Sequence, residues 1–189
     1  MSSKVILASQ SPRRKQLMEM AELVFDIVIA DVDETNPPGM PGEEVPEFLA
    51  KKKADAVRHM VSNAIVIAAD TVVLLDQHIL GKPKDAAHAK EILQQLSGRM
   101  HKVVTGVCIR KGEQEHSFST TTEVYFRTLT DLQIDHYVSR YKPFDKAGAY
   151  AIQEWIGVTG IEKINGDYYN VMGLPIGDVI VALQQFDQY

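Results

Sequence analysis

The amino-acid sequence predicts an α/β fold in which helices flank a mixed β-sheet. Residues 65–69 (IVIAA) are apolar without interruption, as expected for a central strand that is covered on both faces. Residues 101–110 and 115–126 are strand-like on either side of a glycine-containing turn, which predicts a long antiparallel hairpin. Helical and strand-like segments alternate irregularly around these strands, so a mixed sheet is favoured over a regular parallel one.

In the N-terminal part, strands are predicted where apolar residues run together or alternate, and helices where they recur at three- and four-residue spacing. Ser11 before Pro12 marks a helix start, because serine caps free N–H groups and proline needs no N–H in the first turn. In chain order we expect a strand over residues 5–8, a helix over 12–20, a strand over 25–29, a polar loop over 31–44, a helix over 45–60, and a strand over 65–69 that residues 71–75 extend.

In the C-terminal part, the helix boundaries carry the clearest signals. Gly98 follows the end of one helix, Thr130 is an N-cap, and Pro175 stands in the first turn of the last helix. The predicted elements are a turn at 76–77, a helix over 85–96, the hairpin strands 101–110 and 115–126, a helix over 131–140, short strands or loop edges at 148–153 and 168–171, and a helix over 175–186.

Length and charge limit the kinds of partner. A chain of 189 residues predicts one domain, residues 1–189, which is large enough for two lobes about a cleft. The net charge of -5 argues against a nucleic acid polymer, whose binding proteins usually carry a clustered basic face. A small anionic ligand remains compatible, because a few well-placed arginines and lysines suffice to hold a triphosphate.

The sequence predicts a soluble protein of the cytoplasm. The apolar run over residues 5–8 is too short for a signal peptide, and no segment is long and apolar enough to span a bilayer, so no membrane partner is expected. Cys108 is the single cysteine, which excludes an intrachain disulfide and agrees with a reducing compartment. Because Cys108 lies in an apolar run without a neighbouring base, we expect a buried side chain and no nucleophile.

Residues 9–14 (SQSPRR) predict an anion site. They follow a strand and open a helix, where free N–H groups and the positive end of the helix dipole attract negative charge. Arg13 and Arg14 carry the wrong sign for this dipole, and a bound phosphate would relieve the repulsion through charge-assisted hydrogen bonds. The alternative is two solvated arginines on a surface helix. The glycine-rich arrangement of a P-loop is absent.

Acidic residues near two predicted strands suggest a second part of the site. Asp70 ends the very apolar run, and Asp31, Asp33 and Glu34 follow the strand over residues 25–29. Carboxylates beside a polyphosphate usually hold a divalent cation or orient a water molecule. The alternatives are a turn cap for Asp70 and a solvated acidic loop for the other three.

Two lysines are candidates to complete this site, and other site types are disfavoured. Lys82 is held between Gly81 and Pro83, whereas Lys53 lies in a run of three lysines and is weaker evidence by itself. No histidine pair has the spacing of a zinc site, and no nucleophile elbow of a serine esterase is present.

Eight short motifs follow one another along the chain, at residues 9–14, 33–34, 53–54, 69–73, 81–83, 96–98, 145–150 and 173–175. Taken together and in this order, they resemble the Maf family of nucleoside triphosphate pyrophosphatases over residues 5–186. The resemblance implies an α/β fold of the Maf and inosine triphosphatase-like type, with a bent mixed sheet and two lobes around a central cleft. It also implies hydrolysis of the α–β phosphoanhydride of a nucleotide with a divalent cation.

The resemblance also implies individual roles. Asp70 matches the family's catalytic acid/base, and with Glu34 it would hold Mg²⁺ or Mn²⁺, which prefer oxygen ligands. Residues 145–153 resemble the branch that acts on dTTP and UTP, and a homodimer is implied as well. The substrate-binding positions are Ser9, Ser11, Arg13, Arg14, Lys53, Thr71, Lys82 and Gln153, of which Arg13, Thr71 and Gln153 match positions linked to base choice.

Two departures from the family pattern lie beside Gln153. Ala151 stands where glycine is common, and Glu154 and Trp155 follow where small residues are usual. We expect Trp155 to pack in the core; the alternative is that it stacks on a base. A different class of function, a nucleotide-binding regulator of septum formation without turnover, stays open at this point.

Overall fold

One seven-stranded mixed sheet organises the computed structural model, which describes residues 4–186. The strand order is β2-β1-β3-β5-β6-β7, and β4 pairs with β3. β1 is parallel to β2 and β3, whereas every other pairing is antiparallel, so the predicted mixed α/β class is confirmed. The strands are β1 (Lys4–Leu7), β2 (Phe25–Ile27), β3 (Ala64–Leu75), β4 (His78–Leu80), β5 (Met100–Lys111), β6 (Gln114–Phe126) and β7 (Ile161–Asn165).

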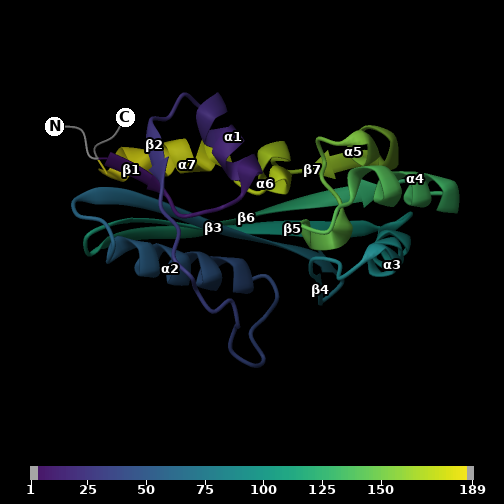
Figure 1. Cartoon of the computed structure of the whole chain (residues 1–189), viewed down its shortest axis with the longest axis horizontal. Helices are drawn as coiled ribbons and strands as arrows, with labels where there is room; N and C mark the ends of the chain where they lie inside the picture. Colours follow the sequence, from purple (N-terminus) through teal and green to yellow (C-terminus); the bar gives the residue numbers. More distant parts are fainter. Residues whose placement is uncertain (1–3, 187–189) are drawn as a thin grey trace.

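The helices form two groups along the sheet. In the first group, near one end of the sheet, α1, α6 and α7 lie on one face and α2 lies on the opposite face (Figure 1). The second group, α3, α4 and α5, lies near the opposite end of the sheet. No helix between residues 4 and 186 combines the length and apolar character needed to cross a membrane. The helices are α1 (Pro12–Met20), α2 (Val45–Arg58), α3 (Ala86–Leu96), α4 (Asp131–Tyr141), α5 (Trp155–Gly160), α6 (Tyr168–Met172) and α7 (Ile176–Leu183), with 3₁₀ turns η1 (Ala147–Ala149) and η2 (Gln184–Phe186).

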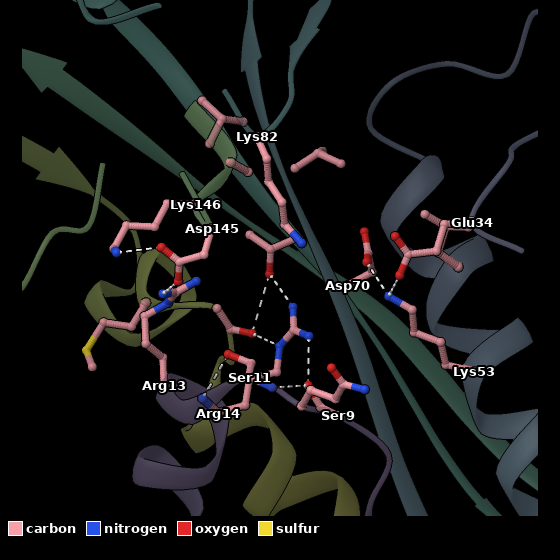
Figure 2. Close-up of a pocket in the computed structure, with 18 of the residues that line it drawn as sticks. Ser9, Ser11, Arg13, Arg14, Glu34, Lys53, Asp70, Lys82, Asp145 and Lys146 are labelled. Carbon is pink, nitrogen blue, oxygen red and sulfur yellow. Dashed lines mark hydrogen bonds and ion pairs between the residues drawn. The ribbon is translucent and has the colours of Figure 1, made fainter. Parts of the chain in front are cut away.

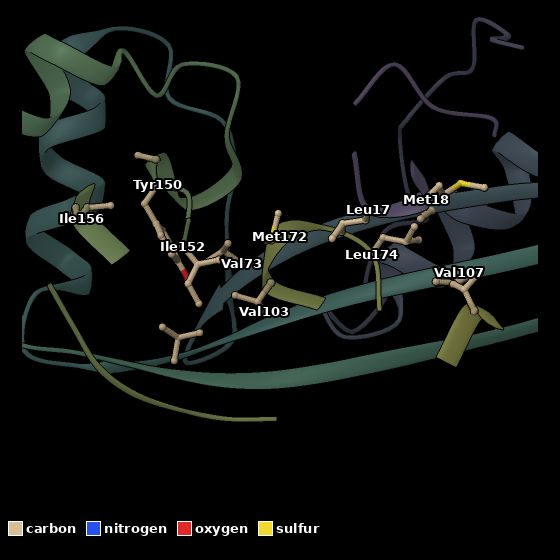
Figure 3. Close-up of a cluster of buried hydrophobic side chains, with 14 of the residues drawn as sticks. Leu17, Met18, Val73, Val103, Val107, Tyr150, Ile152, Ile156, Met172 and Leu174 are labelled. Carbon is tan, nitrogen blue, oxygen red and sulfur yellow. The ribbon is translucent and has the colours of Figure 1, made fainter. Parts of the chain in front are cut away.

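The core explains why the run over residues 65–69 is apolar on every residue. Ile65 and Ile67 pack in the cluster that includes Leu17 of α1, whereas Val66 packs with Ala54 of α2. Successive strand residues point to opposite faces, so a strand between two helical layers needs apolar side chains throughout. Figure 3 shows the α1 side of this core, where Leu17, Met18, Met172 and Leu174 lie together over the sheet.

One edge of β3 has an unpaired stretch among the described residues. β1 pairs with β3 as far as Ile67, and β4 pairs with it only from Val73 onward. Asp70 and Thr71 lie in the interval, with β5 paired on the other side only. A cavity can therefore cross the edge of the sheet here and reach side chains on both of its faces.

The structure corrects some of the predicted elements. Residues 168–171, predicted as a strand or loop edge, belong to helix α6, which Asp167 caps through Tyr169 N and Gly173 ends in the left-handed region. The prediction missed β4, α5 and β7, and residues 148–153 contain the end of η1 followed by a turn. These elements are short, so periodicity carries little information about them. The predicted domain, residues 1–189, includes 1–3 and 187–189, which lie outside the described residues.

Candidate active site

A pocket of about 1050 Å³ opens at the unpaired edge of β3. Its walls come from the start of α1, the loop before α2, the middle of β3, the segment after β4 and the segment around η1. Figure 2 shows the charged side chains that converge there. The pocket brings together every residue to which the family resemblance assigned a role: Ser9, Ser11, Arg13, Arg14, Glu34, Lys53, Asp70, Thr71, Lys82 and Gln153.

The start of α1 forms one wall and has the predicted cap. Ser11 Oγ accepts a hydrogen bond from Arg14 N at 3.4 Å, with Pro12 at the first helical position. Ser9 Oγ accepts from Ser11 N at 3.2 Å, which fixes the backbone immediately before the helix. The capping serine and the helix dipole therefore face the pocket, as an anion site requires.

Arg14 is held in place from three sides. Its Nε donates to Gly173 O at 2.8 Å, and its two terminal nitrogens donate to Ser9 Oγ at 3.2 Å and Thr71 Oγ1 at 3.0 Å. Burial and the neighbouring charge of Arg13 lower the pKa of Arg14, while Asp70 and Glu34 oppose this effect. A guanidinium has five N–H donors, so these bonds leave others free for a phosphate.

A buried network behind Arg14 explains its fixed position. Thr71 Oγ1 lies 2.9 Å from Thr105 Oγ1, and Thr105 donates to Asn170 O at 3.2 Å. Asn170 is fully buried and donates to Val103 O at 3.1 Å and to Thr122 Oγ1 at 2.9 Å. These contacts hold α6 against the sheet. They thereby also fix the Gly173 carbonyl, which follows α6 and accepts the hydrogen bond from Arg14.

Lys53 joins the two carboxylates that the sequence nominated. Its Nζ lies 2.7 Å from Asp70 Oδ1 and 2.7 Å from Glu34 Oε1. The hydrogen bond from Lys53 lowers the pKa of Glu34 and outweighs the opposing effect of burial, so this carboxyl is ionised at neutral pH. Asp70 lies in the middle of β3, opposite Gly106 of β5, and not at a strand end as the sequence analysis expected.

The donor chemistry around Asp70 fits a magnesium-type cation that is shared with a substrate. Between residues 4 and 186 no three or more His, Cys, Asp or Glu side chains form a metal-binding group. Mg²⁺, however, is usually held by only one or two carboxylates together with substrate phosphates. Glu34 and Asp70 supply two such groups in one pocket. Asp33 instead binds Thr35 N at 2.9 Å and Thr35 Oγ1 at 2.6 Å, which closes its own turn.

The wall opposite Lys53 contains charged residues that the sequence analysis did not nominate. Arg13 lies 3.3 Å from Asp145, and Asp145 lies 2.8 Å from Nζ of Lys146, a buried residue. Burial would raise the pKa of Asp145, but the hydrogen bond and charges of Lys146 and Arg13 hold it below its ordinary value. The adjacent opposite charges were a possible signal for this pair. Residues 145–150 and 173–175 match family motifs, but the sequence analysis assigned no role to the side chains of Asp145 and Lys146 or to the Gly173 carbonyl.

Gln153 and Lys82 are the predicted site residues whose side chains are most available to a ligand. Both are exposed and line the pocket. The Gln153 amide makes no hydrogen bond with any residue between 4 and 186, which leaves its donor and acceptor for a ligand. Lys82 follows β4 and points toward the space between Arg14 and Asp70 (Figure 2).

A buried His–Tyr pair supports the floor beside Gln153. His101 Nε2 lies 2.7 Å from the hydroxyl of Tyr150, a pocket-lining residue, and Phe126 packs edge-on against both rings. Burial lowers the pKa of His101 to about 3, so the ring is neutral at pH 7. Gly148 is in the left-handed region with φ +68°, and a Cβ there would come within 2.9 Å of Val73. The segment is therefore packed closely onto β3.

Trp155 packs against the protein, as expected. Its ring lies edge-on to His136 with centroids 4.8 Å apart, and it contacts the main core cluster. Trp155 does not belong to the lining of the pocket described above. Base stacking by this residue is therefore not supported.

Comparison with known proteins agrees with the resemblance. The family model described as "Maf-like protein" matches residues 4–186. The dTTP/UTP pyrophosphatase of Cytophaga hutchinsonii is 49% identical, covering 96% of this chain and 83% of that protein. The protein of the same name from Porphyromonas gingivalis is 46% identical, covering 98% and 95%.

A further relative is the dTTP/UTP pyrophosphatase of Bacteroides thetaiotaomicron, which is 46% identical and covers 91% of this chain and 90% of that protein. Among solved structures, the Staphylococcus aureus Ham1 protein aligns with a TM-score of 0.47 and 17% identity over 66% of this chain and 72% of that chain. On the family match and the relatives at 46% to 49% identity, this chain belongs to the Maf family.

Proposed function

We propose that this protein hydrolyses nucleoside triphosphates to the monophosphate and pyrophosphate, with dTTP and UTP preferred. The observation that carries the proposal is the meeting, in one pocket, of a cationic anion site around Arg14 and the carboxylates of Asp70 and Glu34. The names of the relatives, which share nearly the whole chain, support the same reaction.

The cationic side of the pocket would bind the triphosphate. Arg14 is preorganised by its bonds to Gly173, Ser9 and Thr71, so its remaining donors need little reordering to meet a phosphate. Arg13 and Lys82 line the same space and add positive charge. Fixed donors of this kind stabilise the charge that develops as the phosphoanhydride bond breaks.

Asp70 would act as the general base. It accepts the proton of a water molecule whose oxygen attacks the α-phosphorus; the α–β bond breaks, and the electron pair leaves with pyrophosphate. Asp70 is mostly buried, with 15% of its side chain exposed, on a strand paired along its other edge with β5. This setting keeps the carboxylate in a constant position relative to Arg14.

A divalent cation, Mg²⁺ or Mn²⁺, would be held by Glu34 and Asp70, and when bound it would polarise the phosphoryl group and lower the pKa of the attacking water. Lys53 contacts the same two carboxylates and neutralises part of their charge. It thereby reduces the repulsion between these carboxylates and an incoming triphosphate.

Gln153 is proposed to read the base. Its amide offers one donor group and one acceptor, which match the carbonyl and N3–H edge of thymine or uracil. A site built on such pairs rejects bases that leave them unpaired. The Thr71 hydroxyl instead contacts Arg14 and Gly173, so in this structure its role would be to place Arg14 at the phosphate.

Purified protein should convert dTTP and UTP into the monophosphate and pyrophosphate in the presence of Mg²⁺ or Mn²⁺. We expect EDTA to abolish turnover, and catalytic efficiency to fall for CTP, GTP and 7-methyl-GTP. Product analysis by ion-exchange chromatography measures this. Binding without turnover of any nucleotide would favour the regulator of septum formation. Release of orthophosphate would place the cleavage elsewhere, and a preference for 7-methyl-GTP would overturn the branch assignment.

We further propose that residues 1–189 form one domain that works in the cytoplasm as a homodimer. The continuous sheet from β2 to β7 supports a single domain. The dimer is supported by the family resemblance alone. Multi-angle light scattering at the working concentration should give twice the chain mass of 21.1 kDa, and a clean monomer mass would contradict it.

A further inference from the structure

Behind the pocket wall, the Tyr137 hydroxyl contacts both ends of the turn that carries Gln153. The turn over residues 151–154 is closed by Glu154 N, which donates to Ala151 O at 3.1 Å. Ala151 N donates to the Tyr137 hydroxyl at 3.2 Å, and this hydroxyl donates to a carboxylate oxygen of Glu154. Gln153 is the third residue of the turn and faces the pocket.

Tyr137 is a rigid support for this turn. Its side chain is fully buried on α4, and its ring stacks on Tyr141 with centroids 5.0 Å apart. The helix is fixed at its start by a capping box formed by Thr130 and Gln133. Burial, followed by the hydrogen bond to Glu154, raises the pKa of Tyr137, so the phenol stays protonated and remains a donor.

Glu154 connects the same turn to the charged wall of the pocket. Its second carboxylate oxygen lies 3.5 Å from Lys146 Nζ, which is also 2.8 Å from Asp145. Asp145 in turn contacts Arg13 at 3.3 Å. Glu154 and Tyr137 themselves do not line the pocket as described, so neither touches a ligand there. An effect of either residue on the ligand must be transmitted through the turn or through Lys146.

We propose that Tyr137 and Glu154 are positioning residues for base selection, because they hold the turn over residues 151–154 so that the Gln153 amide meets the pyrimidine edge. The inference rests on the proposed function and concerns how the base is read, not how the phosphate bond is cut.

The variant Tyr137→Phe tests the clamp directly. It keeps the buried ring and removes the hydroxyl, so Ala151 N loses its acceptor and Glu154 loses one donor. We expect the preference for dTTP over dCTP, measured as the ratio of kcat/KM values, to fall about tenfold. This is the change expected when a misplaced Gln153 amide loses about one hydrogen bond to the base. The change should lie in KM, with kcat within about twofold, because Tyr137 makes no hydrogen bond to Arg14 or Asp70, the residues proposed to act on the phosphate.

A double-mutant cycle with Gln153→Ala separates this role from a general loss of structure. If Tyr137 acts through Gln153, then Tyr137→Phe should reduce selectivity no further in the Gln153→Ala background. Glu154→Gln should shift selectivity in the same direction and by less, since its amide keeps the shape and one acceptor. Tyr141→Phe is the matched control: its hydroxyl makes no hydrogen bond within residues 4–186, and its selectivity should equal that of the wild type.

Binding measurements keep the test independent of turnover. Calorimetric Kd values for the α,β-imido analogues of dTTP and dCTP should show the same loss of discrimination in Tyr137→Phe, with thermal unfolding confirming a folded variant. An unchanged Kd ratio in folded Tyr137→Phe, or losses that add to those of Gln153→Ala, would overturn the inference. Failure of the proposed function would be distinct, since the wild type would then release no monophosphate and pyrophosphate from any nucleotide.

Discussion

Replacing Asp70 by asparagine should lower kcat for dTTP by about 10² to 10⁴-fold, the range typical for loss of a general base. Asparagine keeps the shape of the side chain but cannot accept the proton of the attacking water. The neutral asparagine can still accept a hydrogen bond from Lys53, and the triphosphate still meets Arg14 and Lys82, so KM should change little. Steady-state kinetics with saturating Mg²⁺ measures both constants.

Asp76→Asn is the matched control for this experiment. Asp76 directly follows β3, is exposed, pairs with Arg99 at 2.8 Å, and does not belong to the pocket lining. Its φ of 55° lies in the left-handed region, which asparagine tolerates well. We therefore expect wild-type kinetics from this variant. Near-normal turnover in Asp70→Asn would remove Asp70 from the catalytic role and leave Glu34 as the next candidate base.

Replacing Arg14 by lysine should lower kcat/KM by about 10² to 10³-fold, the loss usual for one preorganised donor to a developing charge. A lysine keeps the positive charge but lacks the planar fork, so it cannot bond Gly173, Ser9 and Thr71 together and still present donors to a phosphate. The same measurement with dTTP and UTP should show equal losses, since Arg14 would hold phosphate and not the base.

Arg99→Lys provides the control for an arginine-to-lysine change that affects only an exposed ion pair. Arg99 contacts Asp76 on the surface, and such pairs contribute at most about 1 kcal/mol. Wild-type kinetics are expected. If Arg14→Lys were as active as the wild type while remaining folded by circular dichroism, the fixed guanidinium could not be the main phosphate donor.

Local sequence signals were sufficient to predict the longer strands and helices. The apolar run in β3, the hairpin of β5 and β6, and the caps Ser11 and Thr130 were predicted correctly because each depends on a few neighbouring residues. The short helices α5 and α6 were not predicted. A helix of five or six residues has little stability of its own and is held by tertiary contacts, such as those of the buried Asn170.

The sequence by itself determined the fold class, the serine-capped start of α1 and the residue types of the pocket, because strand periodicity, helix caps and local motifs depend on residues that are near one another in the chain. Only the tertiary structure decided that Asp70 and Thr71 lie on an open edge of β3, since that depends on where β1 ends and β4 begins. It also decided which groups meet across the chain. Arg14 bonds a carbonyl 159 residues away, and Tyr137 clamps the turn of Gln153, through contacts that exist only once the helices have packed on the sheet.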